Sequence, residues 1–97
     1  MSSPVYFVAH IRIHDAQEYK KYLAACDAVF SQFQGQYLAV DSTPLSLEGE
    51  KMDGRTIIIH FPTERDFRQW YESKEYQQIL KHRLAGAHCL SQLVHGL

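Results

Sequence analysis

Two histidines in the most apolar segments of the chain are the first candidates for chemistry. His10 lies in the segment 5–13, and His60 lies in the segment 56–61. An imidazole can act as a general acid or base near neutral pH, and it can also ligate a metal. We therefore take His10 and His60 as candidate catalytic residues, with a structural or interface role as the alternative.

The spacing of these two histidines argues against a shared metal site within one chain. If the segments 5–13 and 56–61 are neighbouring antiparallel strands, the two side chains lie near opposite ends of the pair. The distance between them is then roughly 10 Å, at about 3.3 Å per residue. We expect no metal and no cofactor, although a pairing of histidines across a dimer axis stays open.

Arg83 is the clearest candidate for binding a ligand. It falls on the apolar stripe of a predicted helix, two turns after Tyr76. A guanidinium in that position requires either a carboxylate partner or an anionic ligand. Glu48 is the acid that we nominate as a structural partner. Arg55, at the start of a predicted strand, is a weaker candidate of the same kind.

Aromatic side chains recur at helical spacing along the chain. They form either ordinary core or the lining of a flat apolar pocket, in which tyrosine hydroxyls would orient a carbonyl or phenol group. The candidate ligand-binding residues are Tyr19, Tyr37, Arg55, Trp70, Tyr76 and Arg83, with Tyr22 and Tyr71 in the same aromatic set.

Other kinds of chemistry find no support in the sequence. Nothing matches a serine or cysteine triad, a phosphate-binding loop or a dinucleotide fingerprint. Cys26 falls in the middle of a predicted helix on its apolar side, so a reactive thiolate is not expected. Cys26 and Cys89 are far apart, and we expect two free, buried thiols in a cytoplasmic protein.

Length and charge limit the classes of partner. A chain of 97 residues suits a single domain, residues 1–97. The formal net charge is −1 with acids and bases interspersed, which gives no basic surface for nucleic acid or membranes. No apolar run approaches the roughly 20 residues that span a bilayer. The N-terminal MSSPVYF does not have the pattern of a signal peptide.

The first half of the chain predicts a strand, a helix and a second strand. The segment 5–13 has apolar residues at every odd position and predicts a strand. A helix is predicted over 16–34, with Asp15 as its N-cap and Gly35 as a left-handed stop. An irregular strand is predicted over 36–48, where a proline favours an edge position or a bulge.

The second half predicts a buried strand, a broken helix and a final strand. The segment 56–61 contains three consecutive isoleucines and is typical of a strand. Thr63 is the predicted N-cap of a short helix, and Ser73 is that of a longer helix that ends near residue 86. A last strand is predicted over 88–95. The order β-α-β-β-α-β is that of a ferredoxin-like α+β domain with a four-stranded antiparallel sheet.

The two central strands of such a sheet would be the first and third, and both carry apolar residues on both faces. Two helices on one side can cover only one face of a four-stranded sheet. An uncovered apolar face would promote aggregation, so we expect a homodimer that forms through the second sheet face.

Over nearly its full length the chain resembles the family known as domain of unknown function 1330. The resemblance rests on YKKY at 19–22, GQYL at 35–38, LEG at 47–49, IHFP at 59–62 and YESKEYQ at 71–77, together with Arg55 and Arg83. It implies the dimeric α+β barrel arrangement, in which two ferredoxin-like sheets face each other. Proteins with that arrangement include small monooxygenases, lactone isomerases and haem-binding proteins, whereas the family itself carries no established activity.

The chain departs from this family pattern at two positions. His60 stands where an acidic or other polar residue is usual, and Gln36 stands where a second glycine is usual. The first departure bears on function because His60 is a candidate site residue.

Three functions follow as hypotheses. The first is binding of a small anionic or aromatic molecule in a pocket between the sheet and the helices. The second is a cofactor-independent monooxygenase or isomerase, in which His10 or His60 moves a proton and Arg83 holds a carboxylate or enolate oxygen. The third is a dimeric scaffold without a ligand, which would require Arg83 to be fully paired with Glu48 and no cavity to be present.

Overall fold

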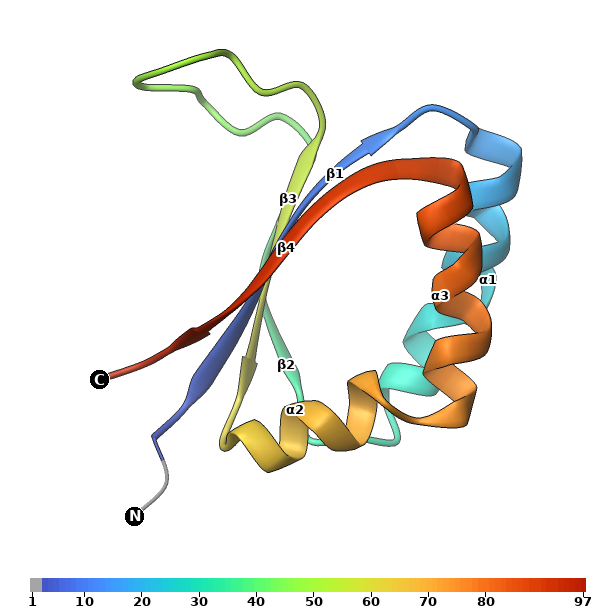
Figure 1. The fold of residues 1–97 in the computed structure, drawn as a ribbon, viewed down its shortest axis with the longest axis vertical. Helices are drawn as coiled ribbons and strands as arrows, with labels where there is room; N and C mark the ends of the chain where they lie inside the picture. The colour runs from blue at the N-terminus through green and yellow to red at the C-terminus, as the bar shows by residue number, and fades with distance from the viewer. Residues whose placement is uncertain (1–2) are drawn as a thin grey trace.

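The computed structural model describes residues 3–97. Met1 and Ser2 lie outside the described residues, and they include part of the N-terminal segment that was searched for a signal peptide. A four-stranded antiparallel sheet carries all three helices on one face (Figure 1). The elements are β1 (Val5–Ile13), α1 (Ala16–Phe30), β2 (Gln36–Asp41), β3 (Arg55–Phe61), α2 (Glu64–Tyr71), α3 (Lys74–Gly86) and β4 (Ala87–His95).

The strand order β2-β3-β1-β4 confirms the ferredoxin-like fold, with β1 and β3 in the centre. In β1, Phe7, Ala9 and Ile11 are buried against the helices, because alternate side chains of a strand point to the same face. Tyr6 pairs with His60 and His10 pairs with Thr56 across β1 and β3. Both histidines therefore lie on the sheet face that the helices leave open.

The second strand is shorter than the sequence indicated. It ends at Asp41, and residues 42–54 form a loop that projects beyond the sheet (Figure 1). The predicted continuation to residue 48 is wrong, since Leu45 and Leu47 are both 84% exposed and have no strand partner. The expected edge position is confirmed, and the register of β2 shifts between Tyr37 and Ala39, as a bulge would require.

The first helix also ends earlier than predicted, at Phe30 and not near residue 34. The backbone N–H groups of Gln32 and Phe33 donate to carbonyls three residues earlier, which tightens the chain into a turn. Gly35 does not have the left-handed backbone that we expected. Its lack of a side chain is needed for a different reason, because a Cβ would lie 2.5 Å from the ring of Phe30 and 2.8 Å from that of Phe61.

The predicted break between the two later helices is confirmed. The hydroxyl of Thr63 accepts from the backbone N–H of Asp66, and the hydroxyl of Ser73 accepts from that of Tyr76. Asp15 caps α1 in the same way through the N–H of Glu18. Each helix thus begins where its capping residue satisfies a free backbone donor.

The end of α3 is fixed against the start of α1. The backbone N–H groups of His14 and Asp15 both donate to the carbonyl of Gly86 at 3.0 Å. A Cβ at Gly86 would lie 2.8 Å from the backbone nitrogen of Tyr19. This contact brings Tyr19 of α1 and Arg83, one turn before Gly86, to the same end of the helical layer.

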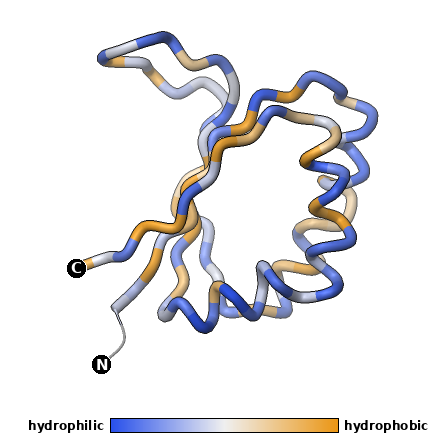
Figure 2. Tube along the Cα trace, viewed as in Figure 1, coloured by the Kyte–Doolittle hydropathy of each residue, from blue (hydrophilic) through white to orange (hydrophobic). Residues whose placement is uncertain are grey.

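Apolar positions lie along the strands and on the inward side of the helices, as the hydropathy colouring shows (Figure 2). An aromatic cluster of Phe7, Phe61, Phe67 and Trp70 fills the space between α2 and the sheet. The open sheet face is apolar as well, and Val94 at its edge is 44% exposed. Within residues 3–97, no helix is long and apolar enough to cross a membrane.

Candidate functional site

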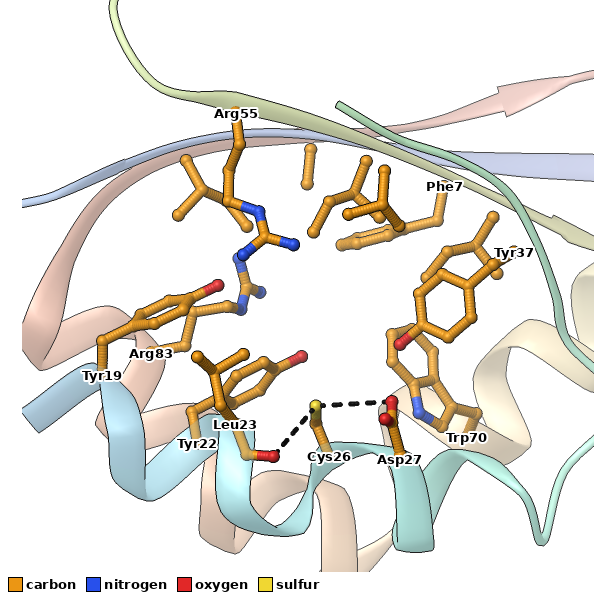
Figure 3. Close-up of a pocket in the computed structure, with 15 residues that line it drawn as sticks. Phe7, Tyr19, Tyr22, Leu23, Cys26, Asp27, Tyr37, Arg55, Trp70 and Arg83 are labelled. Atoms are coloured by element: carbon orange, nitrogen blue, oxygen red, sulfur yellow. Dashed lines mark hydrogen bonds between the residues drawn. The ribbon is translucent and has the colours of Figure 1, made fainter. Parts of the chain in front are cut away.

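A cavity of about 530 Å³ separates the helical layer from the sheet (Figure 3). It opens between α1 and β2, where Leu23, Tyr37 and Val40 are 44%, 39% and 49% exposed. Its size is that of a site for a small organic molecule. The lining residues are Phe7, Ala9, Ile11, Tyr19, Tyr22, Leu23, Cys26, Asp27, Tyr37, Val40, Arg55, Ile57, Ile59, Trp70 and Arg83.

One end of the cavity is cationic. Arg55 enters from the start of β3 and Arg83 from α3, and their guanidinium groups point into the same part of the cavity beside the hydroxyl of Tyr19 (Figure 3). Arg83 is only 2% exposed and Tyr19 only 1%. An arginine remains charged at every physiological pH, so two positive charges meet at this end.

The carboxylate partner that we nominated for Arg83 is wrong. Glu48 lies exposed in the loop 42–54, and no ion pair joins it to Arg83 within residues 3–97. The guanidinium lies over the ring of Tyr22, whose centroid is 5.8 Å from Cζ, and beside Tyr76. A cation over an aromatic face is attracted to the ring. The ring does not, however, act as an acceptor for the N–H groups that point outward in the plane of the guanidinium.

Every buried side-chain donor without a hydrogen-bond partner belongs to this cavity. Among residues 3–97 these atoms are the Tyr19 hydroxyl, Arg55 Nε, Trp70 Nε1, and Nε and Nη1 of Arg83. A buried polar group normally has a partner, and leaving one without costs about 1–3 kcal/mol. Elsewhere in the described part of the chain the buried side-chain donors have partners, so these exceptions mark a place where an acceptor is expected.

The tyrosine at the cationic end keeps its proton. Burial raises the pKa of Tyr19, and the nearby Arg55 and Arg83 only partly oppose that rise. Its hydroxyl is therefore a donor at neutral pH, like the two guanidiniums. All three groups at this end offer hydrogens to an oxygen-rich anion.

The opposite end of the cavity contains Cys26, Asp27, Tyr37 and Trp70 (Figure 3). Burial, followed by the nearby Cys26 and Asp27, raises the pKa of Tyr37 above its usual range. Burial is also the main reason that the pKa of Cys26 rises to about 11, and the carboxylate of Asp27 adds to it. The thiol is thus not a nucleophile at neutral pH, as expected from the sequence.

Tyr76 lies behind the cavity and does not line it. Its hydroxyl forms a 2.8 Å hydrogen bond with the hydroxyl of Tyr22, and its ring packs 4.2 Å from that of Trp70. Burial raises the pKa of both tyrosines. Tyr76 therefore supports two lining residues, whereas Tyr19, Tyr37, Arg55, Trp70 and Arg83 line the cavity directly, as candidates of the sequence analysis.

Both candidate histidines lie on the other side of the sheet. His10 Nδ1 is 3.1 Å from the hydroxyl of Thr56, and the ring of His60 lies 5.6 Å from that of Tyr6. Neither lines the cavity, so a catalytic role for either one stays a prediction for a different surface. In residues 3–97 no group of three histidine, cysteine or acidic side chains is arranged to hold a metal ion.

Sequence reasoning missed Asp27. Asp27 is exposed on α1, yet it lies at the mouth of the cavity. The available signal was its spacing, since Asp27 follows Leu23 by four residues and Tyr19 by eight. Side chains four residues apart share a helix face, and Tyr19, Leu23 and Asp27 on this face all line the cavity.

The fold and cavity define a small ferredoxin-like α+β domain with a largely apolar cavity, cationic at one end, between its helices and its sheet. The chain belongs to the family described as domain of unknown function (DUF1330), which matches residues 4–97. A comparison with curated proteins gives no match.

Solved structures share the fold at low sequence identity. A protein of unknown function from Rhodopseudomonas palustris, RPA0582, superposes with a TM-score of 0.82 at 18% identity, covering 100% of this chain and 85% of that one. SnoaB, a cofactor-independent oxygenase from Streptomyces nogalater, gives 0.69 at 18%, covering 99% and 95%. A dimeric ferredoxin-like protein of unknown function from Thermobifida fusca gives 0.64 at 10%, covering 99% and 93%.

Proposed function

We propose that this protein binds a small organic anion in the cavity between its helices and its sheet. Arg55, Arg83 and Tyr19 hold the anionic group, and the apolar walls hold the body of the molecule. One observation carries the proposal: among residues 3–97, the buried side-chain donors that lack a partner all belong to residues that line this one cavity. Two guanidiniums and a hydroxyl are the donors that a carboxylate or a similar anion accepts from.

A purely structural role for the two arginines explains the same facts less well. A buried charge without a partner is strongly unfavourable, and removing it in favour of apolar side chains commonly stabilises a protein. The chain carries one such charge, Arg83, and the half-buried Arg55 beside it, at an end of the cavity that has no carboxylate. A scaffold without a ligand gains nothing from this arrangement, whereas a binding protein gains an anion site.

The enzyme hypothesis rests on a narrower observation. The pair of guanidiniums could stabilise an enolate or peroxide oxygen, and SnoaB, which shares the fold, is a cofactor-independent oxygenase. The tyrosines and Cys26 in the cavity have pKa values raised away from neutrality, which suits binding better than proton transfer. Turnover of a bound anion that Arg83→Gln abolishes would favour the enzyme.

The binding test is a calorimetric titration with matched acids and neutral analogues. Benzoate, cinnamate, hexanoate and benzenesulfonate are compared with benzamide, which keeps the shape of benzoate but has no charge. We expect the anions to bind and benzamide to bind at least tenfold more weakly, because charge-assisted hydrogen bonds contribute about 1.5–3 kcal/mol. Arg83→Gln and Arg55→Gln should each weaken binding.

The matched control is Arg68→Gln. Arg68 is an exposed arginine that pairs with Glu64 and Glu72 outside the cavity, so its removal should leave binding unchanged. If the whole panel fails to bind to the parent protein, or if Arg68→Gln weakens binding as much as Arg83→Gln does, the proposed function is wrong.

We also propose that two chains associate through their open sheet faces. The half-buried Val8 and Ile58 form an apolar row there, and two of the solved structures with this fold are described as dimeric. Sedimentation velocity should give a dimer for the parent protein and a monomer for Ile58→Lys. Leu84→Lys changes an exposed leucine on α3 and serves as the control, which should remain dimeric.

A further inference from the structure

The second unusual feature of the cavity is the indole N–H of Trp70. Trp70 is 2% exposed, and Nε1 is buried without a partner. The ring cannot turn toward water, since Phe61 stacks on it at 5.5 Å and Tyr76 packs at 4.2 Å. An indole nitrogen only donates hydrogen bonds, so the cavity offers a fixed donor at this point.

This donor lies at the end of the cavity that contains Asp27. The ring of Phe30, one turn after Asp27 on α1, meets the indole edge-on with centroids 5.7 Å apart. Figure 3 places Asp27, Tyr37 and Trp70 together, across the cavity from Arg55 and Arg83. Asp27 is a carboxylate acceptor that the described residues engage only through the weak S–H of Cys26, at 3.8 Å.

The two polar ends are separated by an apolar middle. Tyr19 and Asp27 are eight residues apart on α1, which is about 12 Å along the helix axis at 1.5 Å per residue. Phe7, Ile57 and Ile59 line the sheet side of the space between them. A ligand that reaches both ends therefore carries its polar groups at opposite ends of an apolar body.

We infer that the ligand is a hydroxyaryl monocarboxylate, bound lengthwise, with its carboxylate at Arg55, Arg83 and Tyr19 and its hydroxyl between Trp70 and Asp27. This inference rests on the proposed function. A hydroxyl is the group that fits the far end, because it accepts from the indole N–H and donates to the carboxylate of Asp27 at the same time. A flat ring suits the space beside Tyr37 and Trp70.

The same geometry sets a preference against dianions. A second carboxylate at the far end would face the negative charge of Asp27 and would be rejected. The cavity thus distinguishes three molecules of similar outline: the aryl acid, its para-hydroxy form and the corresponding dicarboxylate. We expect the para-hydroxy acid to bind most tightly and the dicarboxylate to bind least tightly.

The experiment is a titration of matched pairs by calorimetry. Benzoate and cinnamate are each compared with the para-hydroxy form, and each para-hydroxy acid is compared with the dicarboxylate of the same length, which is terephthalate for para-hydroxybenzoate. The two pairs differ in the distance between the carboxylate and the hydroxyl. The para-hydroxy acid should bind more tightly than its parent acid only in the pair whose length spans the cavity. We expect an advantage of about tenfold for that hydroxyl, the effect of a hydrogen bond to a charged group.

Two variants identify the residues that read the hydroxyl. Trp70→Phe keeps an aromatic ring but removes the N–H together with part of the bicyclic indole. The parent aryl acid therefore serves as the internal reference, and the affinity of the hydroxy acid relative to it should fall. Asp27→Asn lies on an exposed position, so it is expected to fold even if Trp70→Phe does not. It should reduce the hydroxyl advantage and bring terephthalate closer to para-hydroxybenzoate.

The outcomes separate the inference from the proposed function. Aryl acids that bind through Arg83 with no hydroxyl advantage at either length leave the anion site intact and overturn the hydroxyaryl assignment, with water as the partner of Trp70. An advantage that both variants retain also overturns it. If no acid binds at all, the proposed function itself fails.

Discussion

Replacing Arg83 with methionine should stabilise the ligand-free protein and remove its anion binding. The guanidinium is 2% exposed, and its Nε and Nη1 atoms have no hydrogen-bond partner. Methionine has a similar length and no charge or donor. It keeps the packing of the aliphatic stem and removes two buried donors that have no hydrogen-bond partner among residues 3–97.

The expected gain follows from two opposing contributions. Each unsatisfied buried donor costs about 1–3 kcal/mol, and Arg83 has two of them. Loss of the contact with the Tyr22 ring, 5.8 Å from Cζ, gives back about 0.5–2 kcal/mol. The difference spans about 0–5.5 kcal/mol, and its midpoint of about 3 kcal/mol lies within the range found when buried ionic groups are replaced by apolar ones.

Urea and thermal unfolding measure this gain directly. For a domain of this size about 1 kcal/mol corresponds to about 4–8 °C in Tm, so a rise of at least about 4 °C is expected. A carboxylate that raises the Tm of the parent protein should leave the Tm of Arg83→Met unchanged. The two effects together, higher stability and lost binding, are the signature of a charge kept for function.

Arg68→Met is the matched control, because it removes an exposed arginine that is paired with Glu64 and Glu72. No rise in Tm is expected there. A cooperative Arg83→Met protein that unfolds at a lower temperature than the parent would contradict the reasoning. That result would mean that the guanidinium has partners in the ligand-free protein, with ordered water as the plainest source.

Three further predictions concern the remainder of the fold. Because the pKa of Cys26 is raised to about 11, alkylation by iodoacetamide should be slow at pH 8, should accelerate as the pH approaches 11, and should slow again when the cavity is filled. Gly35→Ala should destabilise the protein by about 1–3 kcal/mol in urea unfolding, since the added methyl group overlaps the ring of Phe30. Hydrogen bonds from His82 and then Lys21 lower the pKa of Glu18. The stabilising contribution of Glu18 is therefore present above its pKa in the unfolded chain and is lost as the pH falls through its pKa in the folded protein. Glu18→Gln should make the free energy of unfolding depend less on pH in this acidic range.

The sequence predicted the elements well wherever a capping residue or a run of β-branched residues marked them. Asp15, Thr63 and Ser73 begin the three helices as expected, because a side-chain acceptor near a free backbone N–H is a local interaction. Its failures came from contacts between distant segments. Gly35 packs against the rings of Phe30 and Phe61. Phe61 is distant in sequence, so no local pattern predicts that α1 ends early to allow this contact.

The candidate site was predicted in part for the same reason. Arg83 stood out because a charged group on an apolar stripe is a conflict that the sequence displays by itself, whereas Trp70 was one of an aromatic set that could equally form ordinary core. The separation of the histidines from the cavity depends on strand parity, which places His10 and His60 on the open face. Glu48 was a wrong partner because its position depends on the loop 42–54, whose course no periodicity specifies.

Two glycines fix the backbone from which Arg55 and Arg83 enter the cavity, despite the repulsion between the two guanidinium groups. Gly54, directly before Arg55, has φ +114° and lies against the carbonyl of Ile11, which fixes where β3 begins and where Arg55 enters. Gly86 lies against Tyr19 and fixes Arg83 one turn earlier. The backbone positions of both arginines are thus fixed by packing on a neighbouring strand or helix. The cavity is therefore organised for an anion before the anion arrives, and the stability forgone in the empty protein lowers the cost of ordering the site on binding.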